Sequence, residues 1–304
     1  KFIFRYLGLP VFLFYIVVLG STSFWGVNQK DNYFTRELGR NILRGLLPNS
    51  LVLITGDVPT FSALYAQFAE AFRSDVTFVS PIMVGSYNRY QFFTQTHPEL
   101  DFSFPAAATL AGVLAKNYGR VPVYVLAAGD YLYSEGLIAS PSGLVTRIYK
   151  KNDVQAFAGW KKENDELRSL YILPSFSLAD GSRSLGDYAV ASYYERMYQY
   201  IARFCLLNKD YGCANDYYKM AIDLDPLRLD SHIALAKAFA QEKNCKKSQD
   251  EYLFVLKRNP NLKALYIDLY DLAKNCLHDA TLEEKYYQEK TNFENQSVGN
   301  LKSL

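Results

Sequence analysis

The sequence lacks an excess of charge of either sign. Lys and Arg together number 33, and Asp and Glu together number 31, which leaves a formal net charge of +2. Proteins that bind nucleic acid usually carry a basic patch or a large positive charge to contact the phosphates. The net charge of this chain is small and its charges are interspersed, so we expect no nucleic-acid partner.

Metal-binding residue types and catalytic motifs are also scarce. The three His residues lie singly, and the Cys spacings of 8, 32 and 31 residues match no CxxC framework, so we expect no metal site. No GxGxxG or GxxxxGK[ST] loop follows an apolar strand, and no GxSxG elbow is present. The sequence therefore predicts no nucleotide cofactor and contains no recognisable catalytic constellation.

The chain has little of the composition that keeps polypeptides disordered. It contains 11 Pro and 17 Gly, and 49% of its residues are hydrophobic, which is typical of a globular protein. Its 304 residues are enough for about two folded units. Large aromatic side chains, 25 Tyr and 20 Phe, are the main packing material.

One long apolar run lies near the N-terminus. Residues 6–27 carry no charge, and as a helix these 22 residues would extend about 33 Å, enough to cross a bilayer. Lys1 and Arg5 precede the run and Trp25 lies at its end, which predicts a cytoplasmic N-terminus with the rest of the chain outside the cytoplasm. A cleaved signal peptide is the alternative, but the run is longer than a usual signal peptide requires. The chain begins without Met, so we expect it to be the C-terminal piece of a longer protein, with this segment as its last transmembrane helix.

Residues 30–150 alternate between helical and strand patterns. Helices are predicted over residues 32–47, 59–72 and 105–118, and apolar strands over residues 51–54, 75–79 and 121–126. Residues 144–149 form either a fourth parallel strand or the second arm of a hairpin that turns at residues 140–143. This alternation predicts a small, mostly parallel α/β sheet that helices cover on both faces.

Two of the predicted strands end in the same dipeptide, Gly-Asp. Asp57 and Asp130 would both lie beyond the carboxyl ends of their strands, where ligands bind in such sheets. The alternative for Asp57 is a structural one, in which it caps the following helix by accepting a hydrogen bond from a backbone N–H near Thr60.

The last third of the chain repeats. Pro226 and Pro260 are 34 residues apart, the period of tetratricopeptide repeats. In this register the small or aromatic residues that interlock helix pairs recur at Ala202, Ala214, Tyr218, Ala221, Ala236, Ser248, Tyr252 and Val255. We therefore predict stacked helix pairs, with a partial third repeat. Cys213, Cys245 and Cys276 fall at successive turns, so Cys245 and Cys276 are either a disulfide or two thiols, in a compartment that permits disulfides.

The repeats also predict a row of charges. Arg203, Lys237 and Asp271 are each 34 residues apart and should lie on the concave face lined by the first helix of each pair. Such a row either is solvated or binds a protein partner. Because the groove is short, a purely structural role for the repeats carries about equal weight.

Several stretches resemble a known family of membrane proteins. They are residues 38–43 (LGRNIL), residues 47–57 (LPNSLVLITGD), Thr60-Phe61, residues 65–67 and residues 73–76 (RSDV). They look like the region after the membrane module of multi-spanning O-mannosyltransferase-like proteins, which include a widespread bacterial family of unknown function and an animal endoplasmic-reticulum enzyme that mannosylates receptor ectodomains. The most specific piece is the pair GDxxTF and RxDV. The resemblance covers nearly all of residues 1–290, because tetratricopeptide-like repeats also end that family.

The resemblance implies that catalysis resides elsewhere. The GT-C membrane module of that family, with its lipid-phosphate-linked sugar donor, would lie upstream of this chain. The implied role is to position a protein acceptor beside the membrane enzyme, with no cofactor bound by this chain itself. Asp57, Thr60, Gln67 and Asp130 would line an acceptor or sugar pocket beyond the strand ends. Arg73 and Asp75 would form an ion pair or cap at the turn from helix to strand.

We therefore expect a fold that is α/β plus all-α. It would comprise a transmembrane helix at residues 1–27, an extracytoplasmic α/β domain at 28–185, helical repeats at 186–292 and a polar tail at 293–304. The bulk of the chain would lie in the periplasm, at the cell surface or in the endoplasmic-reticulum lumen. Besides acceptor recognition, the functional alternatives are a membrane-anchored repeat scaffold without sugar chemistry, and a free-standing enzyme that uses Asp57 and Asp130 as acid and base.

Overall fold

A computed structural model describes residues 18, 33–80, 94–103, 110–126, 137–150, 157–173 and 185–301 of the chain. The expected transmembrane segment lies outside these residues apart from Val18, and so does Asp130. Within the described ranges, no helix combines the length and the apolar character needed to cross a bilayer.

The first unit is built on a mixed five-stranded sheet with the order β2-β1-β3-β5-β4. Its strands are β1 (Leu51–Leu53), β2 (Thr77–Val79), β3 (Val123–Val125), β4 (Leu137–Ser142) and β5 (Val145–Lys150). β1 is parallel to β2 and β3, whereas β5 is antiparallel to both β3 and β4. The sheet is therefore mixed and not mostly parallel. The hairpin alternative is confirmed, but its turn lies at residues 143–144 and not at 140–143, because residues 140–142 belong to β4. Gly143 makes the reversal possible with a φ of 59°, a conformation that costs glycine little.

Both faces of the sheet are covered, as predicted. Val52 and Ile54 of the first strand region pack into a core with α2 (Phe34–Arg44), α3 (Asp57–Leu64) and α6 (Phe157–Leu170). Leu51 and Leu53 point to the opposite face, where they pack with α5 (Leu110–Asn117) and residues 100–102. This alternation buries every residue from Leu51 to Ile54.

Helices α2 and α3 approach each other closely. A Cβ placed on Gly39 of α2 would lie 2.0 Å from the backbone oxygen of Ser62 in α3, so only glycine fits there. The helix predicted over residues 59–72 is shorter than expected, because α3 continues into a π-helical turn, η1 (Tyr65–Ala69), and ends there.

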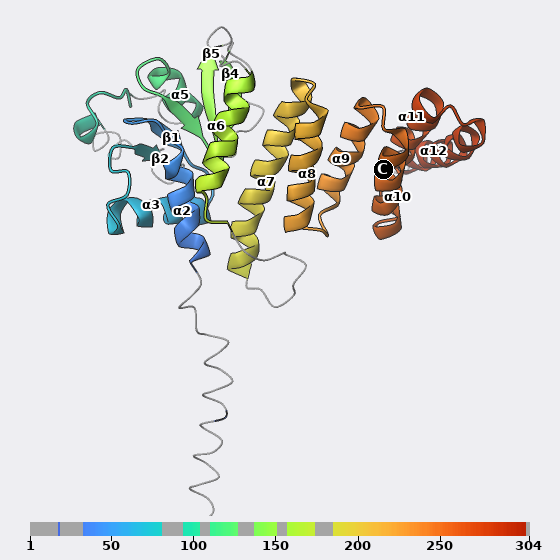
Figure 1. Cartoon of the computed structure of the whole chain (residues 1–304), viewed down its shortest axis with the longest axis horizontal. Helices are drawn as coiled ribbons and strands as arrows, with labels where there is room; N and C mark the ends of the chain where they lie inside the picture. Colours follow the sequence, from blue (N-terminus) through green and yellow to red (C-terminus); the bar gives the residue numbers. More distant parts are fainter. Residues whose placement is uncertain are drawn as a thin grey trace, which may run out of the picture.

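The second unit is a row of helix pairs that extends away from the sheet (Figure 1). The helices are α7 (Leu185–Leu207), α8 (Tyr211–Leu224), α9 (Leu229–Gln241), α10 (Cys245–Arg258), α11 (Leu265–Leu272), the π-helical turn η5 (Ala273–Leu277) and α12 (Ala280–Leu301). The small and aromatic residues of the 34-residue register, from Ala202 to Val255, are all buried. Tyr218, Tyr252 and Tyr286, each 34 residues apart, are buried too.

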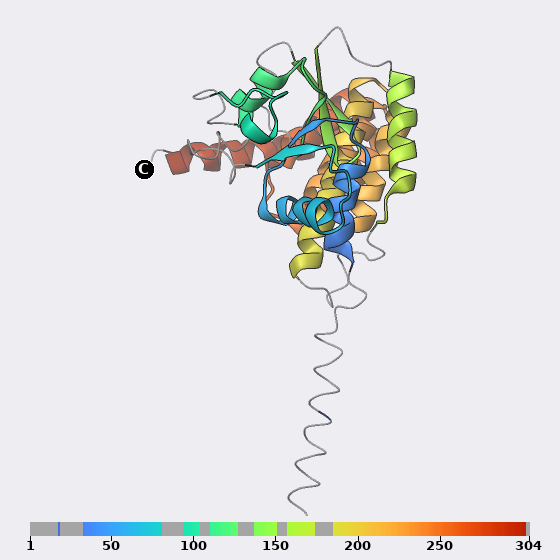
Figure 2. The same ribbon diagram turned by 90° about the vertical axis from the view of Figure 1, so that its left-hand side faces the viewer.

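The two units share one core across the boundary expected at residue 185. Helix α7 begins at Leu185 and lies beside α2 in both views (Figure 1 and Figure 2). Val190 and Tyr194 of α7 belong to the same apolar cluster as Leu38 and Ile42 of α2. Asn41 Nδ2 donates to the Tyr194 hydroxyl over 2.8 Å inside this contact.

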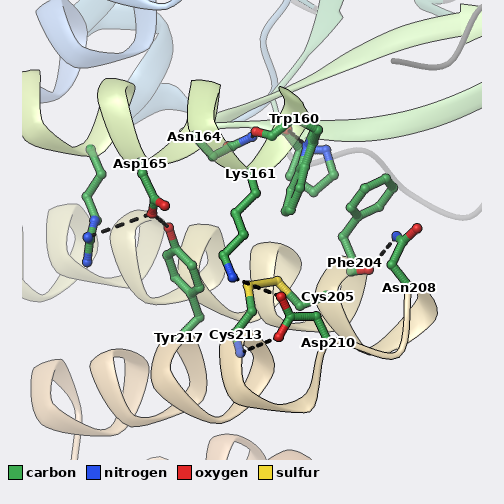
Figure 3. Close-up of a disulfide and its surroundings, with 12 residues drawn as sticks. Trp160, Lys161, Asn164, Asp165, Phe204, Cys205, Asn208, Asp210, Cys213 and Tyr217 are labelled. Atoms are coloured by element: carbon green, nitrogen blue, oxygen red, sulfur yellow. Dashed lines mark hydrogen bonds and ion pairs between the residues drawn. A yellow bond between two sulfur atoms is a disulfide. The ribbon is translucent and has the colours of Figure 1, made fainter. Parts of the chain in front are cut away.

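Helix α6 fastens the first helix pair to the sheet (Figure 3). Lys161 Nζ lies 2.8 Å from Asp210 Oδ2, and the Tyr217 hydroxyl donates to Asp165 over 2.8 Å. On the sheet side, Trp160 Nε1 donates to the backbone oxygen of Pro141 in β4. The first helix pair is therefore held against the α/β unit by both polar and apolar contacts.

Candidate functional site

A cavity of about 390 Å³ opens in the helical stack. Three successive helices, α9, α10 and α11, contribute to its wall, together with the turn η5. Its lining residues are Lys237, Ala240, Gln241, Lys243, Tyr252, Asp268, Asp271, Leu272, Asn275 and Cys276. Most of these side chains carry a polar group, so the cavity offers both hydrogen-bond donors and acceptors.

The charged groups of this cavity form an ammonium and carboxylate cluster. Lys237 Nζ of α9 lies 3.8 Å from Asp268 Oδ2 of α11. Asp271 follows Asp268 by three residues, so both carboxylates lie on one face of α11. Burial raises the pKa of Asp268, an effect that Lys237 opposes and the like charge of Asp271 increases. Asp268 would therefore gain from a second cation.

Tyr252 places a buried phenol at the same cavity. Its side chain is 2% exposed, and its hydroxyl makes no hydrogen bond within the described part of the chain. Burial raises the pKa of Tyr252, and the nearby Asp268 carboxylate raises it further, so the phenol stays protonated at neutral pH. Because Tyr252 lines the cavity, a water molecule or a ligand group there can accept the hydrogen bond of its hydroxyl.

The structure brings together two of the three residues expected in the charged row. Lys237 and Asp271 line the cavity, whereas Arg203 lies one repeat away on α7, exposed and close to Tyr218. One repeat earlier, Ala234 and Lys237 take the places that Asp268 and Asp271 hold here. The acidic pair, Asp268 and Asp271, therefore occurs on α11 and is not repeated at the equivalent positions of α9.

Asp268 and Asn275 are site residues that the sequence reasoning missed. Asp268 could have been found, because it precedes Asp271 by three residues and so shares its helical face. Asn275 lies in the π-helical turn η5, which alters the helical spacing, so its position could not be read from the repeat register.

A disulfide borders the cavity. Cys245 at the start of α10 is bonded to Cys276 of η5, with their Cα atoms 5.7 Å apart, and Cys276 lines the cavity. This is the pairing that the spacing made possible. A second disulfide, Cys205 to Cys213, joins the end of α7 to the start of α8 and was not anticipated (Figure 3).

Three of the residues expected beyond the strand ends lie in or just after α3, where their contacts can be described. Asp57 is exposed in the first turn of α3 and makes no capping hydrogen bond, so the N-cap interpretation is wrong. The Thr60 hydroxyl is buried and donates to the Gly56 backbone oxygen over 2.7 Å. Gln67 Nε2 donates to the backbone oxygens of Arg73 and Val76.

Asp130 lies outside the residues that the structure describes, so the distance between Asp130 and Asp57 is not given. A ligand pocket that uses both carboxylates stays a prediction. Among the described residues, no group of His, Cys, Asp and Glu is arranged to hold a metal ion.

Arg73 and Asp75 have a structural role, as expected. The Arg73 guanidinium makes a two-pronged ion pair with Asp75, with both N–O distances 2.8 Å. The same guanidinium donates to the backbone oxygens of Leu43, Leu46 and Leu47 at the end of α2. The hydrogen bond from Arg73 lowers the pKa of Asp75 to about 2. This pair therefore ties the end of α2 to the start of β2.

Comparison with known proteins gives one distant relationship. No family model matches the chain, and no solved structure matches it. It is 26% identical, over 170 residues, to Protein O-mannosyl-transferase tmem260 of Dictyostelium discoideum. The match covers 50% of this chain and 20% of that protein, so the chain corresponds to a small part of the relative's length. The chain is distantly related to an O-mannosyltransferase.

Proposed function

We propose that this chain is the extracytoplasmic acceptor-recognition region of an O-mannosyltransferase-like membrane glycosyltransferase. The catalytic module, with its lipid-phosphate-linked sugar donor, would belong to a part of the protein upstream of this chain. The distant relationship to an O-mannosyltransferase supports the glycosyltransferase context. The apolar run at residues 6–27 supports attachment to a membrane.

The observation that carries the proposal is the cavity between α9, α10 and α11. It combines the ammonium groups of Lys237 and Lys243, the carboxylates of Asp268 and Asp271, and the Tyr252 phenol, which makes no hydrogen bond to another group in the described chain. Such a mixture suits a peptide segment that presents a basic and an acidic side chain, since each would meet an opposite charge. The buried Tyr252 hydroxyl would donate to a backbone carbonyl of that segment.

A binding experiment tests this proposal. The full chain in detergent micelles is presented to a panel of purified secreted ectodomains, and separately to soluble mannosides. The test variant Lys237→Glu/Asp271→Lys exchanges two of the four charges that line the cavity and keeps the net charge. The matched control Lys162→Glu/Glu166→Lys makes the same exchange on the exposed face of α6.

The expected result is saturable binding of at least one ectodomain by the wild type and the control, and its loss in the test variant. Equal binding by all three proteins would show that the cavity does not take part in recognition. Binding of mannosides alone, lost in the same variant, would point to a sugar site instead.

A second candidate is a membrane-anchored scaffold without sugar chemistry. The contacts that attach α7 and α8 to the α/β unit through α6 favour this candidate, because they would hold the helical repeats at a fixed distance from the α/β unit. The two candidates differ in the proteins that bind. Ectodomains that carry O-linked mannose in cells would support acceptor recognition, whereas partners without that modification would support the scaffold.

A further inference from the structure

An exposed aromatic face lies on α3 and η1. Phe61, Tyr65 and Phe68 recur at spacings of four and three residues, so they share one side of the helix. Their exposed fractions are 59%, 52% and 77%. The opposite side of the helix, with Ala63 and Ala66, is fully buried in the core. Single exposed aromatic residues are common, but three on one face form a patch that favours a covering surface.

Contacts place this aromatic face beside the first turn of α2. Glu70, which follows η1 directly, accepts hydrogen bonds from Arg36 and Arg40 of α2. The turn η1, which begins at Tyr65, also packs directly against α2. Tyr33, just before α2, is also exposed. The end of η1 thus lies at the N-terminal end of α2.

The N-terminal end of α2 is also the end nearest the apolar run in sequence. Only residues 28–33 separate residue 27 from the start of α2 at Phe34. Six residues of fully extended chain reach at most about 22 Å. If residues 6–27 span a bilayer, the first turn of α2 stays within this distance of the membrane surface, and the neighbouring aromatic face does too.

The chemistry of the face fits the interfacial region of a bilayer. Aromatic side chains concentrate at this depth, where a ring leaves water and a phenol keeps a polar partner. The adjacent charges are already paired, because Arg36 and Arg40 both bind Glu70 and each also lies 3.9 Å from the Glu37 carboxylate. Binding of this face to a membrane should therefore depend on the burial of its aromatic rings and not on attraction to anionic lipids.

We propose that Phe61, Tyr65 and Phe68 form a membrane-contact face that rests in the interfacial layer of the bilayer and fixes the orientation of the α/β unit on the membrane. This inference rests on the membrane attachment that is part of the proposed function. It adds a second point of contact, which would set the angle at which the helical stack projects from the membrane.

Fluorescence quenching by lipid tests this proposal. The full chain is reconstituted into phosphatidylcholine vesicles in which part of the lipid carries bromine on carbons near the headgroup. The probe variant is Phe68→Trp in a Trp25→Phe background, and the remaining Trp160 is buried and gives a constant signal. The matched control is Leu207→Trp in the same background. Leu207 is 73% exposed and is the last residue of α7. This end of α7 lies at the opposite edge of the molecule from the start of α2 (Figure 1).

The expected result is a blue-shifted emission for the Phe68→Trp variant and a loss of that emission in brominated vesicles, with no loss for the Leu207→Trp variant. Equal quenching of the two variants would overturn the membrane-contact face. A blue shift without lipid quenching would also overturn it, because another protein surface would then cover the probe.

Extraction of the vesicles with alkaline carbonate separates this inference from the proposed function. Release of the chain by carbonate would contradict the membrane attachment itself. Retention of the chain together with an unquenched Phe68→Trp probe would contradict only the contact face.

Discussion

Replacing Arg73 with Ala should destabilise the fold strongly, although Arg73 belongs to the RxDV stretch that resembles the O-mannosyltransferase-like family. In the structure its guanidinium contacts only groups of the fold, namely three backbone oxygens at the end of α2 and the carboxylate of Asp75. The variant removes all of these bonds at once. It also removes the side-chain donor from the backbone oxygens of Leu46 and Leu47 just after α2, whereas the Leu43 oxygen still accepts from backbone N–H groups.

The expected loss follows from the number and exposure of these bonds. A hydrogen bond contributes about 1 kcal/mol net, and more when the donor is charged. A largely exposed ion pair adds about 0.5 to 1 kcal/mol. Three carbonyl bonds and one ion pair therefore predict a loss of about 3 to 4 kcal/mol in the free energy of unfolding. Lys at this position would recover part of the charge but not the forked geometry.

Urea unfolding of the purified chain, followed by far-ultraviolet circular dichroism, measures this loss. Arg120→Ala is the matched control, since Arg120 is 3.6 Å from Asp101 but half exposed, and its removal should cost less than about 0.5 kcal/mol. Wild-type stability in Arg73→Ala, together with loss of partner binding, would refute the structural interpretation and assign the motif to recognition.

The same pair predicts a dependence of stability on pH. The hydrogen bond from Arg73 holds the pKa of Asp75 at about 2 in the folded chain, below the value of about 3.9 for an unfolded Asp. Its contribution is therefore complete above the unfolded pKa and disappears as the pH falls from about 5 towards 2. Because Asp75 is about one third exposed, the contribution should not exceed about 1 kcal/mol. The unfolding free energies of the wild type and of Asp75→Asn should differ at pH 7 and converge near pH 2.

Three further substitutions test other parts of the structure. Gly39→Val should cost about 3 kcal/mol or prevent folding, because its side chain would overlap the backbone oxygen of Ser62, and thermal unfolding would show this. Cys245→Ser should remove the bond to Cys276 that closes a 31-residue loop and lower stability by up to about 3.7 kcal/mol, measured by urea unfolding without reductant. Asp57→Asn should change the melting temperature little, since Asp57 makes no capping hydrogen bond. A large drop in melting temperature would show that the Asp57 carboxylate stabilises the start of α3.

Much of the α/β unit could be predicted from local patterns. The apolar run from Leu51 to Ile54 and the break at Gly56 place β1 and the start of α3, because a strand buried on both faces needs no polar alternation. The direction of β5 could not be decided in the same way. The turn at Gly143 is held by Asn164 and Tyr171, which are more than 20 residues away and give no local signal.

The functional residues show the same limit. The 34-residue register found Lys237 and Asp271, because repeats place equivalent residues on one face. The register also predicted Arg203 in the row. A cavity forms only where the neighbouring helix completes its wall, and α11 does this for Lys237 by providing Asp268 and Asp271. The capping role expected for Asp57 failed because Thr60 and not Asp57 makes the side-chain bond in that turn.

We propose above that the cavity between α9 and α11 recognises a protein acceptor. The most direct measurement is the dissociation constant of a bound ectodomain for the wild type and for Lys237→Glu/Asp271→Lys, by isothermal titration calorimetry. The account predicts at least a tenfold weaker affinity, about 1.4 kcal/mol, with no change in Lys162→Glu/Glu166→Lys. Equal dissociation constants for all three proteins, each folded as judged by its melting temperature, would contradict it.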